Sequence, residues 1–140
     1  MIDYSSLQKS LKHLERQFEN YKFSQARTEL RDLDREAIAE SVIQRFETCY
    51  DCLWKVLKRY LTEERGLPEV PNSPKPILKL AGQNDLLRSS IQQWLGYADA
   101  RIDTAHDYSG EKAAEVIRIV GEFIADATDL YCRMTGEAWQ

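Results

Sequence analysis

The sequence has no long hydrophobic run and no targeting pattern at its start. None of its 140 residues lies in a stretch that approaches the roughly 20 apolar residues of a membrane-spanning helix. The N-terminal segment MIDYSSLQKS lacks the basic start and apolar centre of a secretory signal. These absences argue against a membrane protein, and we expect a cytoplasmic protein with no membrane contact.

Cysteine is also scarce. Cys49, Cys52 and Cys132 form no even-numbered framework of the secreted kind, so we expect no structural disulfide. Cys49 and Cys52 make a C-x-x-C pattern, but they fall inside a helical pattern, and no second Cys/His pair completes four zinc ligands. We interpret both as small apolar residues of a helix.

An excess of positive charge is missing as well. The chain has 19 Lys and Arg residues against 23 Asp and Glu residues, for a formal net charge of −4. Proteins that coat nucleic acid through a broad basic surface rely on many Lys and Arg contacts to phosphate, so the balance argues against that class. It leaves room for a local phosphate site. With 43% hydrophobic and 30% charged residues, the composition fits one globular domain over residues 1–140.

No segment alternates polar and apolar residues with a period of two. Apolar residues instead recur at steps of three and four, as on one face of an α-helix. The pattern predicts long helices over about residues 3–21, 38–60 and 85–105, and a last one from about residue 110 to the stop at Gly136. A proline-rich loop, LPEVPNSPKP, precedes a short helix opened by Ser73 and Pro74. We therefore predict an all-α fold, an antiparallel four-helix bundle with a short extra helix.

Candidate chemistry is concentrated in RIDTAHDY, residues 101–108, which contains the pattern R-x4-H-x-Y. Arginine holds phosphate through a fixed fork of donors, and histidine titrates near neutral pH. Together, Arg101 and His106 could cleave RNA without a metal: a ribose 2′-hydroxyl attacks the adjacent phosphorus, His106 moves a proton and Arg101 stabilises the developing charge. The alternative is a surface arginine and a histidine that caps the helix end.

Arg101 and His106 are five residues apart, about 140° around an unbroken helix, and would not share a face. We expect either that the helix ends between them or that a two-fold axis brings in the pair from a second subunit. The sequence therefore favours a homodimer, with Trp94 and Tyr97, just upstream of the motif, as candidate contacts.

Two other groups of residues are weaker candidates. Lys55, Lys58 and Arg59 follow Trp54 and could track an RNA backbone, although such a run is also typical of a solvated helix face. Asp99, Asp103 and Asp107 are spaced by four, so the first two could share a helical face and offer oxygens to a divalent metal, but no third ligand is evident. We expect no metal and no cofactor.

Several segments together resemble a known family. The run SVIQRFETCYDCLWKVLKRYL, the proline-rich loop, PKPILKLAG and RIDTAHDY are similar to the nucleotidyltransferase substrate-binding proteins of the HEPN superfamily. The most specific parts are Gln44-Arg45-Phe46-Glu47, Trp54-Lys55 and the R-x4-H-x-Y motif. One departure is Ile102, because the residue after the motif arginine is commonly polar in the family.

The resemblance implies a small helical toxin that dimerises and is encoded beside a minimal nucleotidyltransferase antitoxin. It implies that Arg101 and His106 are ribonuclease residues and that Tyr108 accepts AMP from the partner, which silences the nuclease. Two other interpretations remain open. One is a non-catalytic subunit that binds a nucleotide or substrate for the nucleotidyltransferase, and the other is a helical interaction module with a decayed motif.

Overall fold

The computed structural model describes residues 1–106 and 110–140, with the side chain of His106 outside that description. Over these residues it contains helices and no strand. The helices are α1 (Ser5–Ser24), α2 (Asp32–Glu63), α3 (Pro74–Gln83), α4 (Ile91–His106) and α5 (Gly110–Thr135). The prediction of an all-α bundle with four long helices and one short helix is confirmed.

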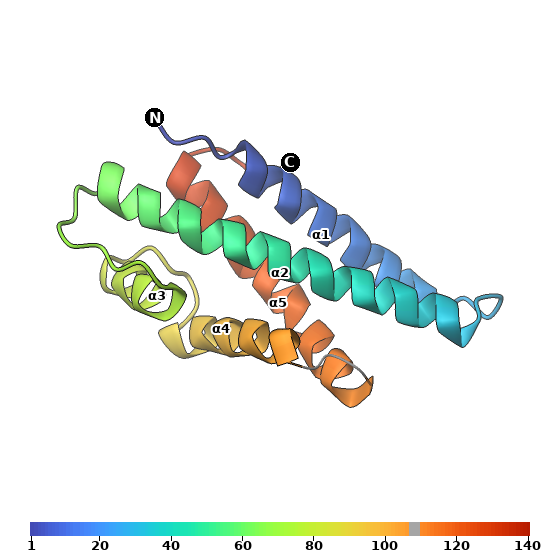
Figure 1. The fold of residues 1–140 in the computed structure, drawn as a ribbon. Helices are drawn as coiled ribbons and strands as arrows, with labels where there is room; N and C mark the ends of the chain where they lie inside the picture. The colour runs from blue at the N-terminus through green and yellow to red at the C-terminus, as the bar shows by residue number, and fades with distance from the viewer. Residues whose placement is uncertain (107–109) are drawn as a thin grey trace.

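The long helices pack along one another (Figure 1). Helices α1 and α2 form an antiparallel pair, α5 contacts α1, α2 and α4, and the short α3 packs against α2 and α4. The predicted stripe of α1 is buried, since Leu7, Leu11 and Leu14 are each 0% exposed. No helix in the described residues is both long enough and apolar enough to cross a membrane.

An aromatic cluster joins α2, α4 and α5. Phe123 of α5 lies at its centre, with ring centroids 5.0 Å from Phe46 and 5.3 Å from Tyr97. Trp94 packs edge-on against Tyr97 at 5.3 Å. Trp94 and Tyr97 are both 1% exposed in the monomer, so the prediction that they contact a second subunit is wrong. Their apolar area is used in the core of the chain itself.

Glycine follows the ends of α2 and α5, and proline lies at the start of α3. Gly66 and Gly136 have φ angles of +64° and +75°, a left-handed conformation that glycine adopts without steric cost. Pro74 occupies the first turn of α3, where no backbone donor is needed. Ser73 precedes it in an extended conformation, but its side chain makes no capping hydrogen bond.

The starts of two helices differ from the prediction. Helix α2 begins at Asp32 rather than near residue 38, and α4 begins at Ile91 rather than near Asp85. Asp85 has a φ of +57°, which interrupts a right-handed helix. Arg88 and Ser89 then turn to α5, where both donate hydrogen bonds to Asp126 Oδ1, at 3.0 and 2.6 Å.

Candidate functional site

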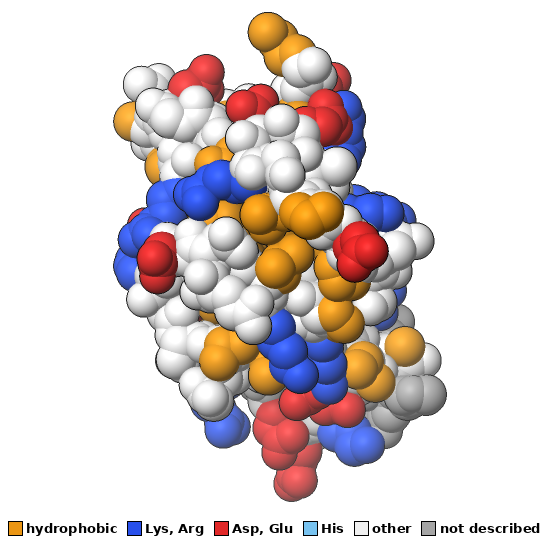
Figure 2. Space-filling view, turned by 90° about the vertical axis from the view of Figure 1, so that its left-hand side faces the viewer, with side chains coloured by type: hydrophobic (Ala, Val, Ile, Leu, Met, Phe, Trp, Pro, Cys, Tyr) orange, Lys and Arg blue, Asp and Glu red, His pale blue; other side chains and the backbone are white. Residues whose placement is uncertain are grey.

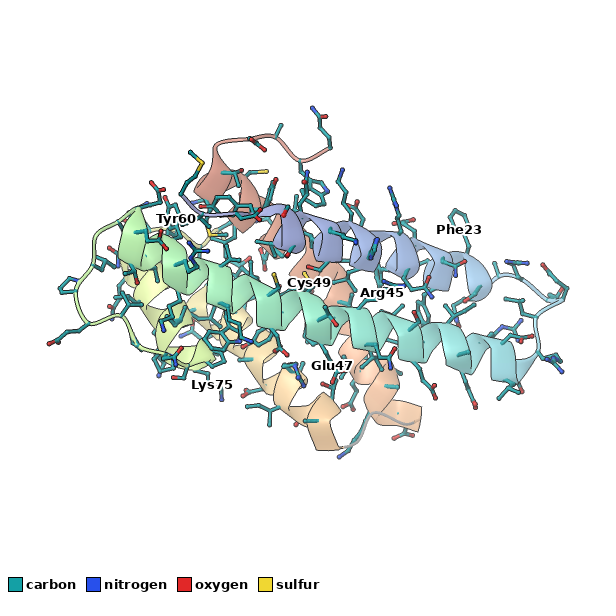
Figure 3. The ribbon with its side chains drawn as sticks, turned by 45° about the horizontal axis from the view of Figure 1, so that its top comes forward. Phe23, Arg45, Glu47, Cys49, Tyr60 and Lys75 are labelled. Carbon is teal, nitrogen blue, oxygen red and sulfur yellow. The ribbon has the colours of Figure 1, made fainter. Side chains whose placement is uncertain are left out.

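Arg101 lies on α4 and reaches across to α2. Its Nε and Nη2 donate to the two carboxylate oxygens of Asp51 at 3.1 and 3.0 Å, a two-point contact. Its Nη1 donates to Glu47 Oε2 at 3.2 Å. Glu47 and Asp51 are four residues apart on α2 and so present their carboxylates on one side of the helix. Figure 3 shows Glu47 on the side of α2 that faces α4. The motif arginine therefore has a fixed orientation.

The electrostatics around Arg101 combine one positive and two negative charges. Hydrogen bonding to the Asp51 carboxylate raises the pKa of Arg101 above its usual value, so the guanidinium is charged at any working pH. The three bonds use three of the five guanidinium N–H donors, which leaves two for another ligand. Arg101 is 27% exposed, so these donors are close to solvent.

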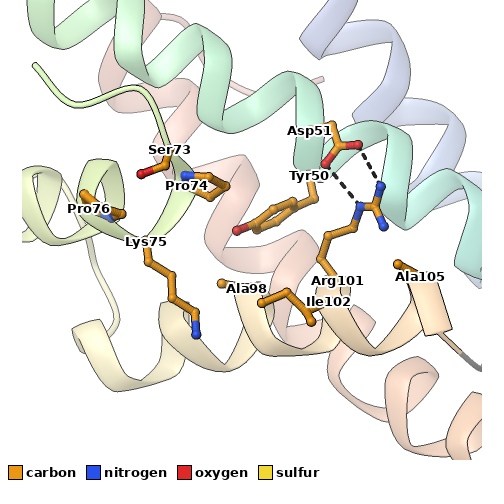
Figure 4. Close-up of a pocket in the computed structure, with 10 residues that line it drawn as sticks. All are labelled: Tyr50, Asp51, Ser73, Pro74, Lys75, Pro76, Ala98, Arg101, Ile102 and Ala105. Carbon is orange, nitrogen blue, oxygen red and sulfur yellow. Dashed lines mark hydrogen bonds and ion pairs between the residues drawn. The ribbon is translucent and has the colours of Figure 1, made fainter.

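A pocket of about 530 Å³ opens beside Arg101, between α2, the start of α3 and α4 (Figure 4). Its wall is mostly apolar. It is lined by Tyr50, Asp51, Ser73, Pro74, Lys75, Pro76, Ala98, Arg101, Ile102 and Ala105. The volume falls within the range of small-molecule sites. Arg101 and Lys75 are the cations of this lining.

Each of these cations has an acidic partner. Lys75 Nζ lies 2.7 Å from Asp99 Oδ1, which ties the start of α3 to α4. Arg101 is held by Glu47 and Asp51 at the α2 side. A ligand phosphate would have to share either cation with a carboxylate, whereas an apolar, flat group needs only the wall between them.

Tyr50 lies in this wall with its phenol oxygen unpartnered. The residue is 2% exposed, and its hydroxyl has no hydrogen-bond partner within the described part of the chain. In Figure 4 its ring extends from α2 across the pocket, with the oxygen end toward Pro74. Burial, together with the nearby charge of Asp51, raises the pKa of Tyr50, so the phenol stays protonated. It can therefore act as a hydrogen-bond donor.

The second motif residue lies at the end of α4. Helix α4 continues through His106, which contradicts the first of the two alternatives, a helix end between Arg101 and His106. On a continuous helix, positions 101 and 106 are about 140° apart around the axis. The placement of the His106 side chain and of Tyr108 lies outside the described residues.

The basic group of α2 lies outside the pocket. Lys55 Nζ lies 5.9 Å from the centroid of the Trp54 ring, and Lys58 Nζ donates to Asn72 Oδ1 at 2.9 Å. Arg59 forms an ion pair with Glu63 at 2.9 Å. None of the three lines the pocket beside Arg101. Lys55 is exposed one helical turn beyond Asp51, about 6 Å along the axis.

The cysteines form no disulfide in the part of the chain that is described. Cys49, Cys52 and Cys132 are free thiols, and burial raises the pKa of Cys49 to about 12. No group of three His, Cys, Asp or Glu residues among the described positions is arranged to hold a metal ion. Asp107, the third aspartate of the considered set, lies outside that description.

Three residues of the site were not predicted from the sequence. The spacing of Glu47 and Asp51 was an available indication, since acidic residues at positions i and i+4 lie on one face of a helix. Their partner Arg101 is 50 residues away from Asp51 along the chain, so the pairing depends on the tertiary fold. Tyr50 carries no such signal, because its spacing is that of a core residue.

The structure defines the class of protein: an all-helical bundle with a polar site between its second and fourth helices. Among known families, the one described as nucleotidyltransferase substrate binding protein like matches residues 2–136, and the chain belongs to this family. The predicted resemblance is thereby confirmed. The chain is also 28% identical over 98 residues to a Haemophilus influenzae protein named probable ribonuclease HepT. That alignment covers 69% of this chain and 66% of the relative, just under two thirds of the relative's length.

Two solved structures are similar to this one. A Thermus thermophilus protein is 27% identical with a TM-score of 0.67, over 87% of this chain and 98% of that one. A Haemophilus influenzae protein is 22% identical with a TM-score of 0.84, over 94% of this chain and 98% of that one. Its structure is described as revealing the fold of a substrate binding domain of a nucleotidyltransferase. The second likeness supports the fold alone.

Proposed function

We propose that this protein is the toxin of a HEPN and minimal nucleotidyltransferase pair, a metal-independent endoribonuclease that acts as a homodimer. The observation that carries the proposal is Arg101, which lies within the R-x4-H-x-Y motif, is oriented by two carboxylates and borders an open pocket. The relative named probable ribonuclease HepT supports the same activity. His106 is the second residue of the proposed reaction.

The proposed reaction uses only these two side chains and the RNA itself. The 2′-oxygen of a ribose attacks the adjacent phosphorus, the bond from phosphorus to the 5′-oxygen of the next nucleotide breaks, and a 2′,3′-cyclic phosphate forms. His106 takes the 2′-hydroxyl proton or returns one to the leaving oxygen. Arg101 directs its two remaining N–H donors at the phosphoryl oxygens, where negative charge develops.

The acidic and basic side chains near Arg101 have different roles in the proposed reaction. Glu47 and Asp51 hold the guanidinium in one orientation at the cost of weakening its attraction for phosphate. Figure 2 shows basic and acidic side chains intermixed on the face at the α3 end, with no continuous basic stripe. Lys55, one turn beyond Asp51, and Lys58 and Arg59 after it offer positive charge to an RNA strand that leaves the site along α2.

Growth of cells that express the chain alone tests the toxin role. We expect expression of the wild type to arrest growth and expression of Arg101→Ala to permit it, at equal protein levels. Asp103→Asn, a change at an exposed position of α4, is the matched control and should remain toxic. Growth that is unaffected by the wild type, in the absence of any partner, would contradict the toxin role.

The partner nucleotidyltransferase is proposed to transfer AMP to Tyr108. A phosphodiester and an adenosine near the end of α4 would add negative charge and bulk close to the site that must bind an RNA phosphate. Intact mass after co-expression with the nucleotidyltransferase measures this: the wild type should gain one AMP and Tyr108→Phe none. AMP on another tyrosine would refute the assignment of Tyr108.

A second function is favoured by the pocket itself. An apolar cavity of about 530 Å³ with Arg101 and Lys75 beside it could hold a nucleotide for the partner enzyme without any cleavage. This is the non-catalytic alternative. It predicts nucleotide binding that persists in His106→Ala and no loss of RNA on long incubation with the wild type.

A further inference from the structure

The pocket beside Arg101 has two chemically different parts. One edge carries the guanidinium, which the proposed reaction assigns to the phosphate. The rest is an apolar wall, formed at the start of α3 and along α4 by Pro74, Pro76, Ala98, Ile102 and Ala105. Ile102 is 50% exposed, so this wall stands open to solvent (Figure 4). A ligand that used only Arg101 would leave the wall unused.

Tyr50 adds to that wall a buried polar group without a partner within the described residues, whereas Ser73, the other hydroxyl of the lining, is exposed to solvent. The Tyr50 phenol is buried without a hydrogen-bond partner, although buried polar groups are nearly always paired. An unsatisfied buried donor costs about 1–3 kcal/mol. Trp94 Nε1 is also buried without a partner, but it does not line the pocket. Tyr50 is therefore the unpartnered group placed where a ligand could satisfy it.

We propose that the pocket seats one nucleobase of the RNA, next to the phosphate at Arg101, and that the Tyr50 hydroxyl donates a hydrogen bond to an acceptor atom of that base. This inference rests on the proposed ribonuclease function and names the group that selects where the RNA is cut. A base fits because it is flat and apolar on its faces and carries acceptors at its edge. Apart from Arg101, the only cation that the described lining offers to a second phosphate is Lys75, which is paired with Asp99.

The depth of the hydroxyl limits the ligand further. Because the phenol oxygen is buried, a group resting at the mouth of the pocket does not reach it. Only a ligand that reaches beyond the mouth of the pocket satisfies it. The pocket therefore binds a base that is not stacked on its neighbours, which agrees with recognition of single-stranded rather than paired RNA.

Tyr50→Phe isolates this hydroxyl. The ring is kept, and no hydrogen bond within the described residues is lost, so the variant should be at least as stable as the wild type in thermal unfolding. For its preferred base at the cut site, kcat/KM should fall about three- to tenfold, the equivalent of one neutral hydrogen bond. The difference in kcat/KM between the preferred base and the other three bases should become smaller by the same factor. Tyr60→Phe on the same helix, outside the pocket, is the control. It should change neither kcat/KM nor the preference among the four bases.

A binding measurement separates this inference from the ribonuclease proposal. Titration calorimetry with the four nucleoside 3′-monophosphates and with ribose phosphate needs no cleavage. We expect one nucleotide to bind more tightly than ribose phosphate, and we expect this advantage to shrink in Tyr50→Phe but not in Tyr60→Phe. If affinity depends on the base but RNA is not cleaved, the ribonuclease proposal is refuted and the base-binding proposal is supported.

Three results would overturn the base-binding proposal. One is equal affinity for ribose phosphate and all four nucleotides. Another is a folded Tyr50→Phe protein with the same nucleotide affinities and the same cutting preference as the wild type. The third is a dimer that binds none of the nucleotides, which would show that a second copy of the chain covers the pocket.

Discussion

Arg101 is held by the carboxylates of two residues that lie one helical turn apart on α2. The pairing has two opposite effects on a phosphate: it fixes the donor geometry, and it lowers the local positive charge. Misplacement of a catalytic group by about 1 Å can cost on the order of a hundredfold in rate, because geometry enters the barrier directly. We therefore expect orientation to dominate over the loss of charge.

Substitution of Asp51 tests this balance. Asp51→Asn keeps the shape but removes the charge and the two-point contact with Arg101. We expect kcat for RNA cleavage to fall about ten- to a hundredfold, while KM for RNA stays the same or falls because repulsion of phosphate is weaker. Steady-state kinetics with Asp103→Asn as control measures both. A higher kcat would show that Asp51 restrains Arg101 rather than positioning it.

Cys49 offers a second test at this scale. It is 0% exposed, and burial raises the pKa of its thiol to about 12. Only the thiolate reacts with alkylating agents, so at about pH 8 iodoacetamide should modify Cys132 while Cys49 stays unmodified in the folded chain. Peptide mass spectrometry measures each site. Early modification of Cys49 would place that face of α2 in solvent and contradict the packing of α1 on α2.

Some residues of the candidate site could be predicted from the sequence alone, and others could not. Arg101 was predicted, since its type and its motif are local features. Its partners Glu47 and Asp51 were not, because the contact joins helices that are adjacent only after folding. Tyr50 was not, because a buried tyrosine at helical spacing is indistinguishable in sequence from an ordinary core residue.

At the scale of elements, Asp126 of α5 connects the segment before α4 to the rest of the bundle. This buried carboxylate accepts hydrogen bonds from Arg88, Ser89 and Tyr97. These bonds hold residues 88 and 89 outside the helix, which explains why the predicted start of α4 near Asp85 was too early. Apolar periodicity continued into this segment, since Leu87 fits the stripe, but the contact that decides the boundary comes from 37 residues away.

Replacement of Asp126 should loosen this connection. Asp126→Asn retains the volume but loses charge-assisted bonds, and we expect the free energy of unfolding to fall by about 2–4 kcal/mol. Asp129→Asn on the same helix is the matched control. Its ion pair with Arg133 spans i to i+4 and is partly exposed, so about 0.5 kcal/mol or less is expected. Urea unfolding compares the two, and equal losses would refute a special role for Asp126.

At the scale of the whole molecule, the continuous α4 favours a dimer for the proposed site. Positions 101 and 106 lie about 140° apart around one helix, so we expect Arg101 of one protomer to meet His106 of its partner. The helices themselves were predictable because each one carries its own periodic stripe. The contact residues of a dimer were not, since the two that were predicted, Trp94 and Tyr97, lie in the core of the monomer.

Mixing of two inactive variants tests the shared site. Arg101→Ala and His106→Ala should each be inactive as homodimers. In a mixed dimer, one of the two sites has both side chains intact, so co-expression of the two variants should restore about a quarter of wild-type activity when the protomers pair at random. Light scattering should show dimers throughout. Mixed dimers without recovered activity would mean that both groups act within one chain.

The proposed activity is cleavage of RNA without a metal, through Arg101 and His106. The most direct measurement is incubation of the purified wild type with single-stranded RNA in excess EDTA, beside His106→Ala and Arg101→Ala proteins of equal helix content by circular dichroism. We expect fragments ending in 2′,3′-cyclic phosphate from the wild type and intact RNA from both variants. Cleavage that stops with EDTA, or that persists without His106, would contradict it.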